Sequence, residues 1–286
     1  MFKDHLSQFL SLKKPNTRRA YFTAVHHLKI YLNSAANFCD QDAAIGYLSE
    51  FREGRSDASL KHRYHLLRAY FEYLVNVGAI QSNPFRIIPT LLSMRQHNQV
   101  RPTKTLTAQQ VNRIINNIDT SKPEGRLVFA FMGLLFGGGL RRSEALALRP
   151  ADIILEGPGR GYAVHLRGTK SGVTDLQPIP RWLGSIIKKV LDDLKKSKQI
   201  NGPLFSWSEK TAYRIFRNAC LDCGINASPH SFRAAAATLL KEQGEEDRTV
   251  ANFLRHKTTH MVQVYDHRAR KALAKTNKCL EDFFEN

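Results

Sequence analysis

The feature that most constrains the fold is an almost wholly apolar run over residues 126–137. A helix that is apolar on all sides is stable only where other elements enclose it. The run stops at three consecutive glycines, Gly137 to Gly139, and glycine readily ends a helix. A membrane-spanning helix needs about 20 apolar residues, and no run of that length occurs in the sequence. The chain is therefore expected to build a domain around a buried central helix.

The rest of that domain, predicted over residues 106–286, combines helices with a short strand region. Thr107 is expected to cap the first helix, which carries Val111, Ile114, Ile115 and Ile118. Turn residues separate three segments predicted as short strands, near 151–155, 162–167 and 174–179. Helical spacing after Pro180 predicts helices at 181–198, 209–222, 229–243, 247–254, 258–267 and 270–284. The predicted class is mainly α with a small antiparallel β-sheet (α+β).

Residues 1–90 predict a separate domain of four helices. The clearest helix repeats apolar residues at steps of three and four, and it ends at Gly78; they are Leu60, Tyr64, Leu67, Phe71 and Leu74. The earlier helices are marked by Phe2 to Leu10, by a cap at Asn16 or Thr17 before Tyr21 to Leu32, and by a cap at Asp40 or Asp42. Residues 91–105 contain a polar run and Pro102, and they are predicted to be an interdomain linker.

The charge of the chain favours a polyanionic partner. Its formal net charge is +18 and its isoelectric point is about 9.9. Residues 1–95 hold 13 basic and 7 acidic residues, and residues 96–286 hold 30 and 18. Because both parts are basic, two domains that clamp one nucleic acid fit better than one basic tail. A membrane surface or a merely soluble basic enzyme are the alternatives that charge leaves open.

The spacing of the cysteines and the lack of common enzyme motifs argue against a structural zinc site and against the commonest cofactor-dependent and hydrolase classes. Four scattered cysteines and no export signal predict reduced cytosolic thiols. Cys220 and Cys223 form a CxxC within a helical pattern, but no second pair completes the four ligands of a structural zinc site. The chain also lacks the GxGxxG, Walker, HExxH and GxSxG motifs. No cofactor and no metal are expected.

Five short motifs carry residues suited to cutting DNA without a metal. Such a reaction needs fixed cations for the phosphate oxygens, a proton for the leaving oxygen and a nucleophile that becomes covalently attached. Arginine matches phosphate best, because its planar fork can donate two hydrogen bonds. The motifs are, in chain order, Gly139–Glu144 (GLRRSE), Gly168–Gly172 (GTKSG), Pro229–Arg233 (PHSFR), Leu254–His256 (LRH) and Tyr265–His267 (YDH).

These motifs, their order and the nine-residue step from His256 to Tyr265 resemble the tyrosine recombinases, that is, the phage integrase family with its Xer-like enzymes. The resemblance covers nearly the whole chain. It implies that Tyr265 is the nucleophile and forms a 3′-phosphotyrosyl link. It further implies that Arg141, Arg233 and His256 hold the phosphate oxygens, that Lys170 protonates the leaving 5′ oxygen, and that His230 assists proton transfer. Glu144, three residues after Arg141, is expected to orient it.

The chain departs from the family pattern at a few positions. Arg255 stands where many relatives have glycine; it is expected either to contact a phosphate or to point to solvent. Ala234–Ala237 follow Arg233 where the family often has His-Thr, and alanine should preserve the helix. Arg167 lies close to Lys170, and Arg142 competes in principle with Arg141, although the register of the motif favours Arg141.

The resemblance also implies an assembly. The two domains of one chain would form a C-shaped clamp on double-stranded DNA at a specific recombination site. Four protomers would act on two such sites through a Holliday junction, with accessory proteins as optional partners. The helix at 270–284 is expected to pack on a neighbouring protomer, and the alternative is packing on its own domain. Basic residues expected on the DNA side of the first domain are Arg18, Arg19, Lys61 and Arg63. The expected location is the cytoplasm, at the nucleoid. The alternatives are a catalytically silent DNA-binding protein, a type IB topoisomerase and a metal-dependent nuclease, and the last lacks a convincing Asp/Glu cluster.

Overall fold

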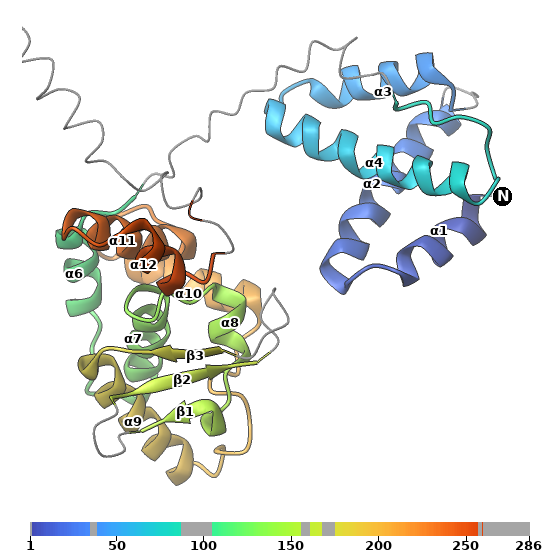
Figure 1. The fold of residues 1–286 in the computed structure, drawn as a ribbon. Helices are drawn as coiled ribbons and strands as arrows, with labels where there is room; N and C mark the ends of the chain where they lie inside the picture. The colour runs from blue at the N-terminus through green and yellow to red at the C-terminus, as the bar shows by residue number, and fades with distance from the viewer. Residues whose placement is uncertain are drawn as a thin grey trace, which may run out of the picture. The chain divides into compact units, whose positions relative to one another are not determined.

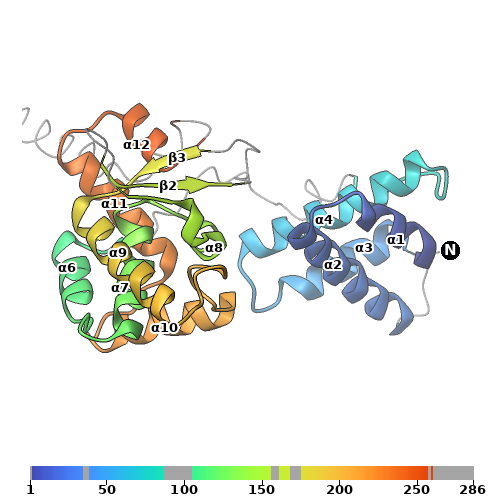
Figure 2. The ribbon, with the colours of Figure 1, turned by 90° about the horizontal axis from the view of Figure 1, so that it is seen from below.

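The computed structural model describes residues 2–34, 39–86, 105–155, 161–167, 175–256 and residue 259. The chain divides into two compact units, Met1–Gln99 and Val100–Asn286. The first unit is helical, and the second combines helices with one small sheet (Figures 1 and 2). The predicted class, mainly α with a small antiparallel sheet, is confirmed. Apart from residues 105 and 259, the linker expected at 91–105 and the helices expected at 258–267 and 270–284 lie outside the described residues.

The first unit is organised around its last long helix. Its helices are α1 (Phe2–Ser11), α2 (Pro15–Ser34), α3 (Gln41–Arg52) and α4 (Asp57–Asn76). Helix α4 contacts each of the other three, and Figure 1 shows it running across them. All five apolar residues of its predicted stripe are buried, which confirms that this face forms the core.

Most helix ends in this unit follow the expected capping chemistry. Asp40, and not Asp42, caps α3, since its side chain accepts a hydrogen bond from the Ala43 amide at 2.8 Å. Helix α4 is followed by Gly78 at φ +72°, a left-handed conformation that glycine adopts without strain. Helix α2 begins at Pro15, slightly before the predicted cap at Asn16 or Thr17. Proline suits a first helical position because its missing N–H would have no partner there.

The second unit surrounds helix α7 (Pro123–Phe136), the predicted buried run. Val111, Ile114 and the centre of α7 share one core, and α7 packs mainly on α9 and α11. The other elements are α6 (Ala108–Asn116), α8 (Arg142–Ala147), α9 (Arg181–Lys196), α10 (Glu209–Leu221), α11 (Pro229–Glu242) and α12 (Asp247–Phe253). Thr107 caps α6 in a reciprocal arrangement with Gln110, as expected.

The sheet is antiparallel, with strand order β1–β2–β3 (Figure 1). Its strands are β1 (Ile153–Ile154), β2 (Ala163–Leu166) and β3 (Asp175–Pro178), and Val164 of β2 pairs with Gln177 of β3. The prediction of a strand from 151 is partly wrong, because Pro150–Asp152 form a 3₁₀ turn. Pro150 starts this turn, and the Asp152 carboxylate accepts the Arg149 amide at 2.9 Å.

No helix among the residues that the structure describes is both long and apolar enough to span a membrane.

Candidate active site

The first part of the site lies where α7 gives way to α8. Gly139 has φ +57°, and it turns the chain sharply after the buried helix. Arg141 is the cap residue of α8, and Glu144 occupies the first turn of that helix. The Glu144 carboxylate accepts the Arg141 amide at 2.8 Å and the Arg141 guanidinium at 2.7 Å. The Glu144 carboxylate thereby fixes both the backbone amide and the guanidinium of Arg141.

Arg142 is directed to a different carboxylate. Its Nη2 forms an ion pair with Oε2 of Glu209 on α10 at 2.7 Å, and both side chains are substantially exposed. Of the two adjacent arginines, Arg141 is therefore the one whose guanidinium is held by Glu144.

Helix α11 brings the second arginine to the same place. Ser228 caps this helix and Pro229 begins it, so that His230 and Arg233 stand one turn apart. The Arg233 side chain is buried, with 2% exposure. Its guanidinium donates to the backbone carbonyls of Gly139 and Leu254. Arg233 consequently joins the turn before α8 to the segment that follows α12.

The third arginine, Arg255, points into the protein and not to solvent. Its backbone has φ +52°, a region that favours glycine, and its side chain is only 8% exposed. Nη2 donates to Glu144 Oε2 at 2.7 Å and to the Gly139 carbonyl at 3.0 Å. Nη1 donates to Gln177 Oε1 at 2.6 Å and to the Phe253 carbonyl at 3.3 Å. Both terminal nitrogens are thus occupied by acceptors of the protein.

We use the term arginine cluster for Arg141, Arg233 and Arg255, together with His230 and His256. Burial lowers the pKa of His256 to about 4, helped by the charges of the three arginines and His230. The His230 ring is accessible, but partial desolvation, followed by Arg233 and Arg141, also lowers its pKa. The His256 imidazole is therefore neutral at pH 7, and the pKa of His230 is shifted in the same direction. Within the described residues, Nδ1 of His256 is buried without a hydrogen-bond partner.

Glu144 is the carboxylate that this cluster shares. Burial by itself would raise the pKa of Glu144, but the Arg141 amide, the charge of Arg255 and the hydrogen bonds from both arginines lower it. An ionised Glu144 offsets only part of the positive charge around it. The arrangement is suited to an additional anion, and a phosphodiester in reaction gathers negative charge on its oxygens.

The sequence pattern of the phage integrase family matches residues 104–272, more than half of the chain, and this stretch includes all five motifs. The chain belongs to the phage integrase family. Over its length it resembles a tyrosine recombinase XerD from Listeria innocua, at 26% identity across 92% of this chain and 93% of the relative. A tyrosine recombinase XerA from Thermococcus onnurineus is 27% identical across 88% and 85%.

Solved structures support the same fold for this integrase-family chain. A XerH site-specific recombinase bound to its difH substrate superposes with a TM-score of 0.69, at 18% identity, over 92% of this chain and 80% of that protein. A lambda integrase dimer bound to a core site gives a TM-score of 0.67 over 92% and 76%. At these identities the likeness concerns the fold.

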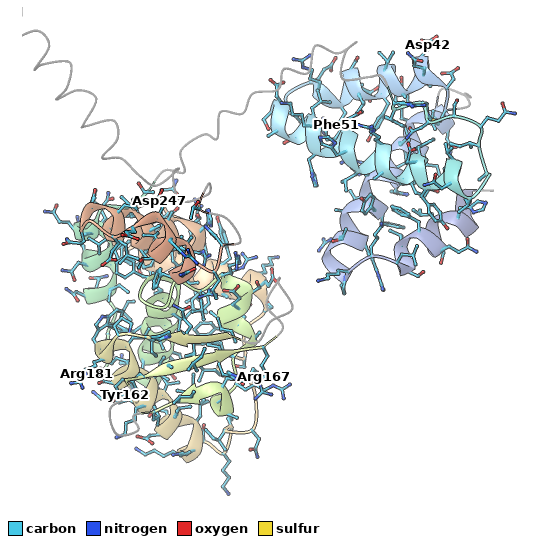
Figure 3. The ribbon with its side chains drawn as sticks, in the orientation of Figure 1. Asp42, Phe51, Tyr162, Arg167, Arg181 and Asp247 are labelled. Carbon is cyan, nitrogen blue, oxygen red and sulfur yellow. The ribbon has the colours of Figure 1, made fainter. Side chains whose placement is uncertain are left out.

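Two of the integrase motifs fall beyond what the structure describes. Tyr265 lies outside the described residues, and so does Lys170, which the sequence places in the connection between β2 and β3. Arg167, the neighbour that could be confused with Lys170, forms an ion pair with Asp152 at 2.6 Å. Figure 3 shows Arg167 beside the ends of the strands, directly after β2.

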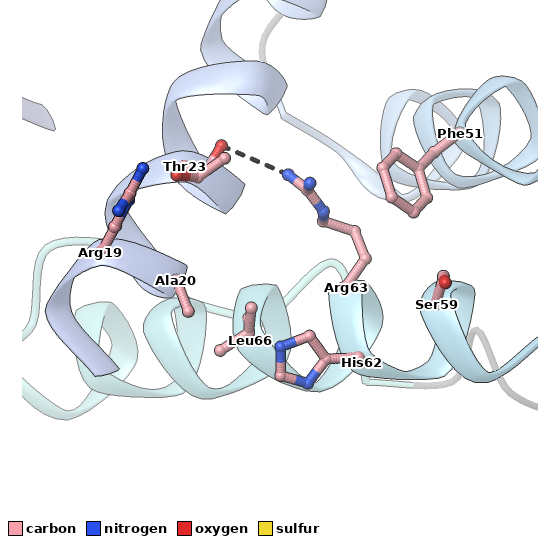
Figure 4. A pocket seen from close by; sticks show the side chains of 8 residues that line it. All are labelled: Arg19, Ala20, Thr23, Phe51, Ser59, His62, Arg63 and Leu66. Carbon is pink, nitrogen blue, oxygen red and sulfur yellow. Dashed lines mark hydrogen bonds between the residues drawn. The ribbon is translucent and has the colours of Figure 1, made fainter. Parts of the chain in front are cut away.

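Four of the basic residues predicted to contact DNA lie in the first unit, and two of these, Arg19 and Arg63, line a hollow of about 440 Å³. We call it the basic hollow; Figure 4 shows its lining residues Arg19, Ala20, Thr23, Phe51, Ser59, His62, Arg63 and Leu66. Arg63 donates to the Thr23 carbonyl at 3.3 Å and lies 4.4 Å from the centre of the Phe51 ring.

Two other predicted DNA-contact residues stand outside this hollow. Arg18 turns back to the end of α1, where it donates to the carbonyls of Lys13 at 2.6 Å and Ser11 at 3.2 Å. Lys61 lies half-exposed on α4 and does not line the hollow.

The CxxC pair is part of the core. Cys220 is fully buried, and burial, with a contribution from Cys223, raises the pKa of its thiol to about 12. Cys223 is also buried, and its Sγ lies 3.8 Å from the Arg113 carbonyl. Across the described ranges, no group of three or more His, Cys, Asp and Glu side chains is arranged to hold a metal ion.

Sequence reasoning missed two residues of the site. Gly139 was predicted to end a helix and to open the GLRRSE motif, but no contact was assigned to its carbonyl, which accepts hydrogen bonds from Arg233 and Arg255. Gln177 was read only as part of a strand, yet its side chain is buried and bonded to Arg255. A polar residue next to prolines in a short strand was the available signal for Gln177, but nothing in the sequence names its partner.

Proposed function

We propose that this chain is a site-specific DNA recombinase that cuts and rejoins strands through a covalent 3′-phosphotyrosyl link at Tyr265. The observation that carries the proposal is the arginine cluster in a chain of the phage integrase family. Arg233 and Arg255, from separate motifs, both donate to the Gly139 carbonyl, and Glu144 holds Arg141 two residues further on. The protein's own cations would then perform the charge stabilisation that a metal ion performs in many nucleases.

In the proposed reaction the Tyr265 oxygen attacks phosphorus, and the bond from phosphorus to the 5′ oxygen breaks. Arg141 and Arg233 hold the nonbridging oxygens, and neutral His256 donates a further hydrogen bond. Lys170 gives its proton to the leaving 5′ oxygen, while His230 assists removal of the tyrosine proton. One phosphodiester replaces another, so the bond energy is kept for rejoining and no nucleotide cofactor is needed.

For binding, we infer that the basic hollow takes a phosphate of the duplex. Arg19 and His62 are exposed on its wall, and Arg63 adds a third donor. The partner would be double-stranded DNA with a specific recombination site, held by a clamp of two domains. Four protomers, a Holliday junction, optional accessory proteins and a place at the nucleoid in the cytoplasm belong to the same proposal. DNA-bound structures of the relatives XerH and lambda integrase are consistent with a DNA partner.

The decisive experiment first searches the DNA that flanks the gene for this chain for inverted repeats around a short central spacer, and then uses a nicked duplex built on them. After cleavage the short fragment beside the nick diffuses away, and the covalent adduct accumulates. We expect a protein–DNA adduct that survives denaturation with the wild-type chain, in EDTA as well as in its absence, and none with Tyr265→Phe. Equal behaviour of the two proteins would refute the mechanism.

Two controls separate the alternatives. Relaxation of a supercoiled plasmid that lacks the repeats would indicate a type IB topoisomerase. Binding of the duplex without any adduct would indicate a catalytically silent DNA-binding protein.

A further inference from the structure

Arg255 occupies a backbone conformation that L residues rarely adopt. Its φ of +52° lies in the left-handed region, where glycine is free of the clash between its side chain and the backbone. Only one other described non-glycine residue, Lys198, has a positive φ. An arginine held in this region and 8% exposed needs contacts that favour it over a smaller residue.

Those contacts join three separate segments of the second unit. Glu144 belongs to α8, Gly139 to the turn before it, and Gln177 to strand β3. The Gln177 side chain is 5% exposed, and Arg255 supplies the hydrogen bond to its amide oxygen. The sequence separations are 111 and 78 residues for Glu144 and Gln177, so the contacts exist only in the folded domain.

Arg255 also shares an acceptor with each of the other two arginines. It shares the Glu144 carboxylate with Arg141: Oε1 accepts from Arg141 and Oε2 from Arg255. It shares the Gly139 carbonyl with Arg233. One planar guanidinium therefore touches the supports of both arginines that the proposed reaction uses, while its other edge touches β3.

We propose that Arg255 is a positioning residue that fixes Arg141 and Arg233 in one frame and couples that frame to strand β3 through Gln177. The inference rests on the proposed recombinase function. Strand β3 ends the hairpin whose connection contains Lys170, the proposed acid. Coupling through Arg255 would thus align the cations on the phosphate with the group that protonates the leaving oxygen.

The chemistry of this position favours arginine over lysine. A guanidinium has two terminal nitrogens with four N–H groups in one plane, and the structure assigns an acceptor to each of the four. An ammonium has three donors on one nitrogen and cannot reach Gln177 and Glu144 on opposite sides. Lysine at position 255 should therefore retain the charge but lose the coupling.

The test compares cleavage of two nicked duplexes in single-turnover reactions. One is the ordinary substrate, and the other carries sulfur in place of the bridging 5′ oxygen, a leaving group that needs no acid. The variants are Arg255→Gly, Arg255→Lys, Gln177→Leu and the Arg255→Gly/Gln177→Leu pair. Arg126→Gln is the matched control, because it breaks a two-bond ion pair with Asp193 between α7 and α9, away from the site.

We expect Arg255→Gly and Arg255→Lys to cleave the ordinary duplex at least tenfold more slowly than wild type. The loss should be clearly smaller on the sulfur duplex. Gln177→Leu should show the same pattern more weakly, and adding it to Arg255→Gly should change the rate less than twofold, since both act through one contact. Arg126→Gln should remain within twofold of wild type on both duplexes, whatever its thermal stability.

The following outcomes would contradict the inference. Rates within twofold of wild type for both Arg255 variants would overturn the inference. Equal losses on the two duplexes would overturn the coupling to strand β3, because misplaced Arg141 and Arg233 alone slow the cleavage of both duplexes alike. If Arg255→Gly does not fold, Arg255→Lys and Gln177→Leu decide the question by the same comparison. Absence of an adduct with the wild-type chain would instead refute the recombinase function itself.

Discussion

Each unit of the molecule gathers arginines, but it holds them in different ways. In the basic hollow, Arg19 is exposed, and Arg63 rests against the Phe51 ring and a carbonyl at the edge of an open space (Figure 4). In the arginine cluster, Arg233 and Arg255 are buried and hold backbone carbonyls of the Gly139 turn. Exposed cations give an affinity that salt screens, whereas buried cations act in a medium of lower dielectric.

The choice of partners in the cluster is informative. A backbone carbonyl accepts hydrogen bonds from a guanidinium without cancelling its charge, and a carboxylate cancels it. Arg233 is held by the carbonyls of Gly139 and Leu254, and the shared Glu144 is the carboxylate that holds Arg141 and Arg255. The cluster is thereby rigid and still positive, which are the two properties that transition-state stabilisation requires.

The largest effect should come from a change inside the cluster. Arg233→Lys retains the charge but cannot hold the Gly139 and Leu254 carbonyls and a phosphate with one nitrogen. We expect the single-turnover cleavage rate to fall by about 10²–10³, as for removal of one oxyanion donor. DNA affinity, measured by titration on the same duplex, should change by only a few fold. If only DNA affinity fell and the cleavage rate did not, Arg233 would contribute to DNA binding alone, as is proposed for the basic hollow.

A smaller effect, on DNA affinity and not on the cleavage rate, is expected in the basic hollow. Arg63→Gln should weaken DNA binding by about tenfold, which corresponds to a charged hydrogen bond of ~1.5 kcal/mol. Loss of one phosphate contact should also make the slope of log affinity against log salt shallower by about 0.9. Lys195→Gln, which removes an exposed charge near the end of α9, is the control and should leave that slope unchanged. An unchanged slope for Arg63→Gln would separate the hollow from DNA binding.

The two regions also differ in what the sequence could predict. The core of the first unit follows local rules. Leu60, Tyr64 and Leu67 repeat at helical spacing in α4, and the sequence narrows the cap of α3 to Asp40 or Asp42, of which Asp40 is the cap. The buried run of α7 is likewise visible, because an apolar stretch must be enclosed. Periodicity and capping involve residues within four positions of one another, so the sequence displays them directly.

The contacts of the cluster are of another kind. The side chain of Arg255 could have pointed to solvent, and only the fold brings Glu144 and Gln177, from distant positions, to meet it. The family pattern implied that Arg141 and Arg233 both hold phosphate oxygens. It did not predict that the Gly139 carbonyl accepts hydrogen bonds from both Arg233 and Arg255. Packing of segments far apart in the chain decided these contacts, and local propensity contains no record of it.

The last effect expected is a pH dependence of stability in the second unit. Burial and the neighbouring arginines lower the pKa of His256 to about 4 in the folded protein, whereas an unfolded histidine titrates near ~6.5. As the pH falls below ~6.5, the unfolded chain binds a proton that the folded chain does not bind. Stability is therefore complete above this pH, declines down to about 4 and then levels off, with His230 contributing in the same direction.

Urea unfolding of the wild type and of His256→Asn at pH 7.5 and pH 5 measures this effect. We expect the wild type to lose more stability between the two pH values than the variant, since asparagine does not titrate. Sulfate, which offers the cluster an anion, should reduce the loss in the wild type, because it offsets the charges of Arg141 and Arg233 that lower the pKa of His256. If sulfate left the loss of wild-type stability between pH 7.5 and pH 5 unchanged, the arginine cluster would not be an anion site. It would then share with the basic hollow only the presence of arginines.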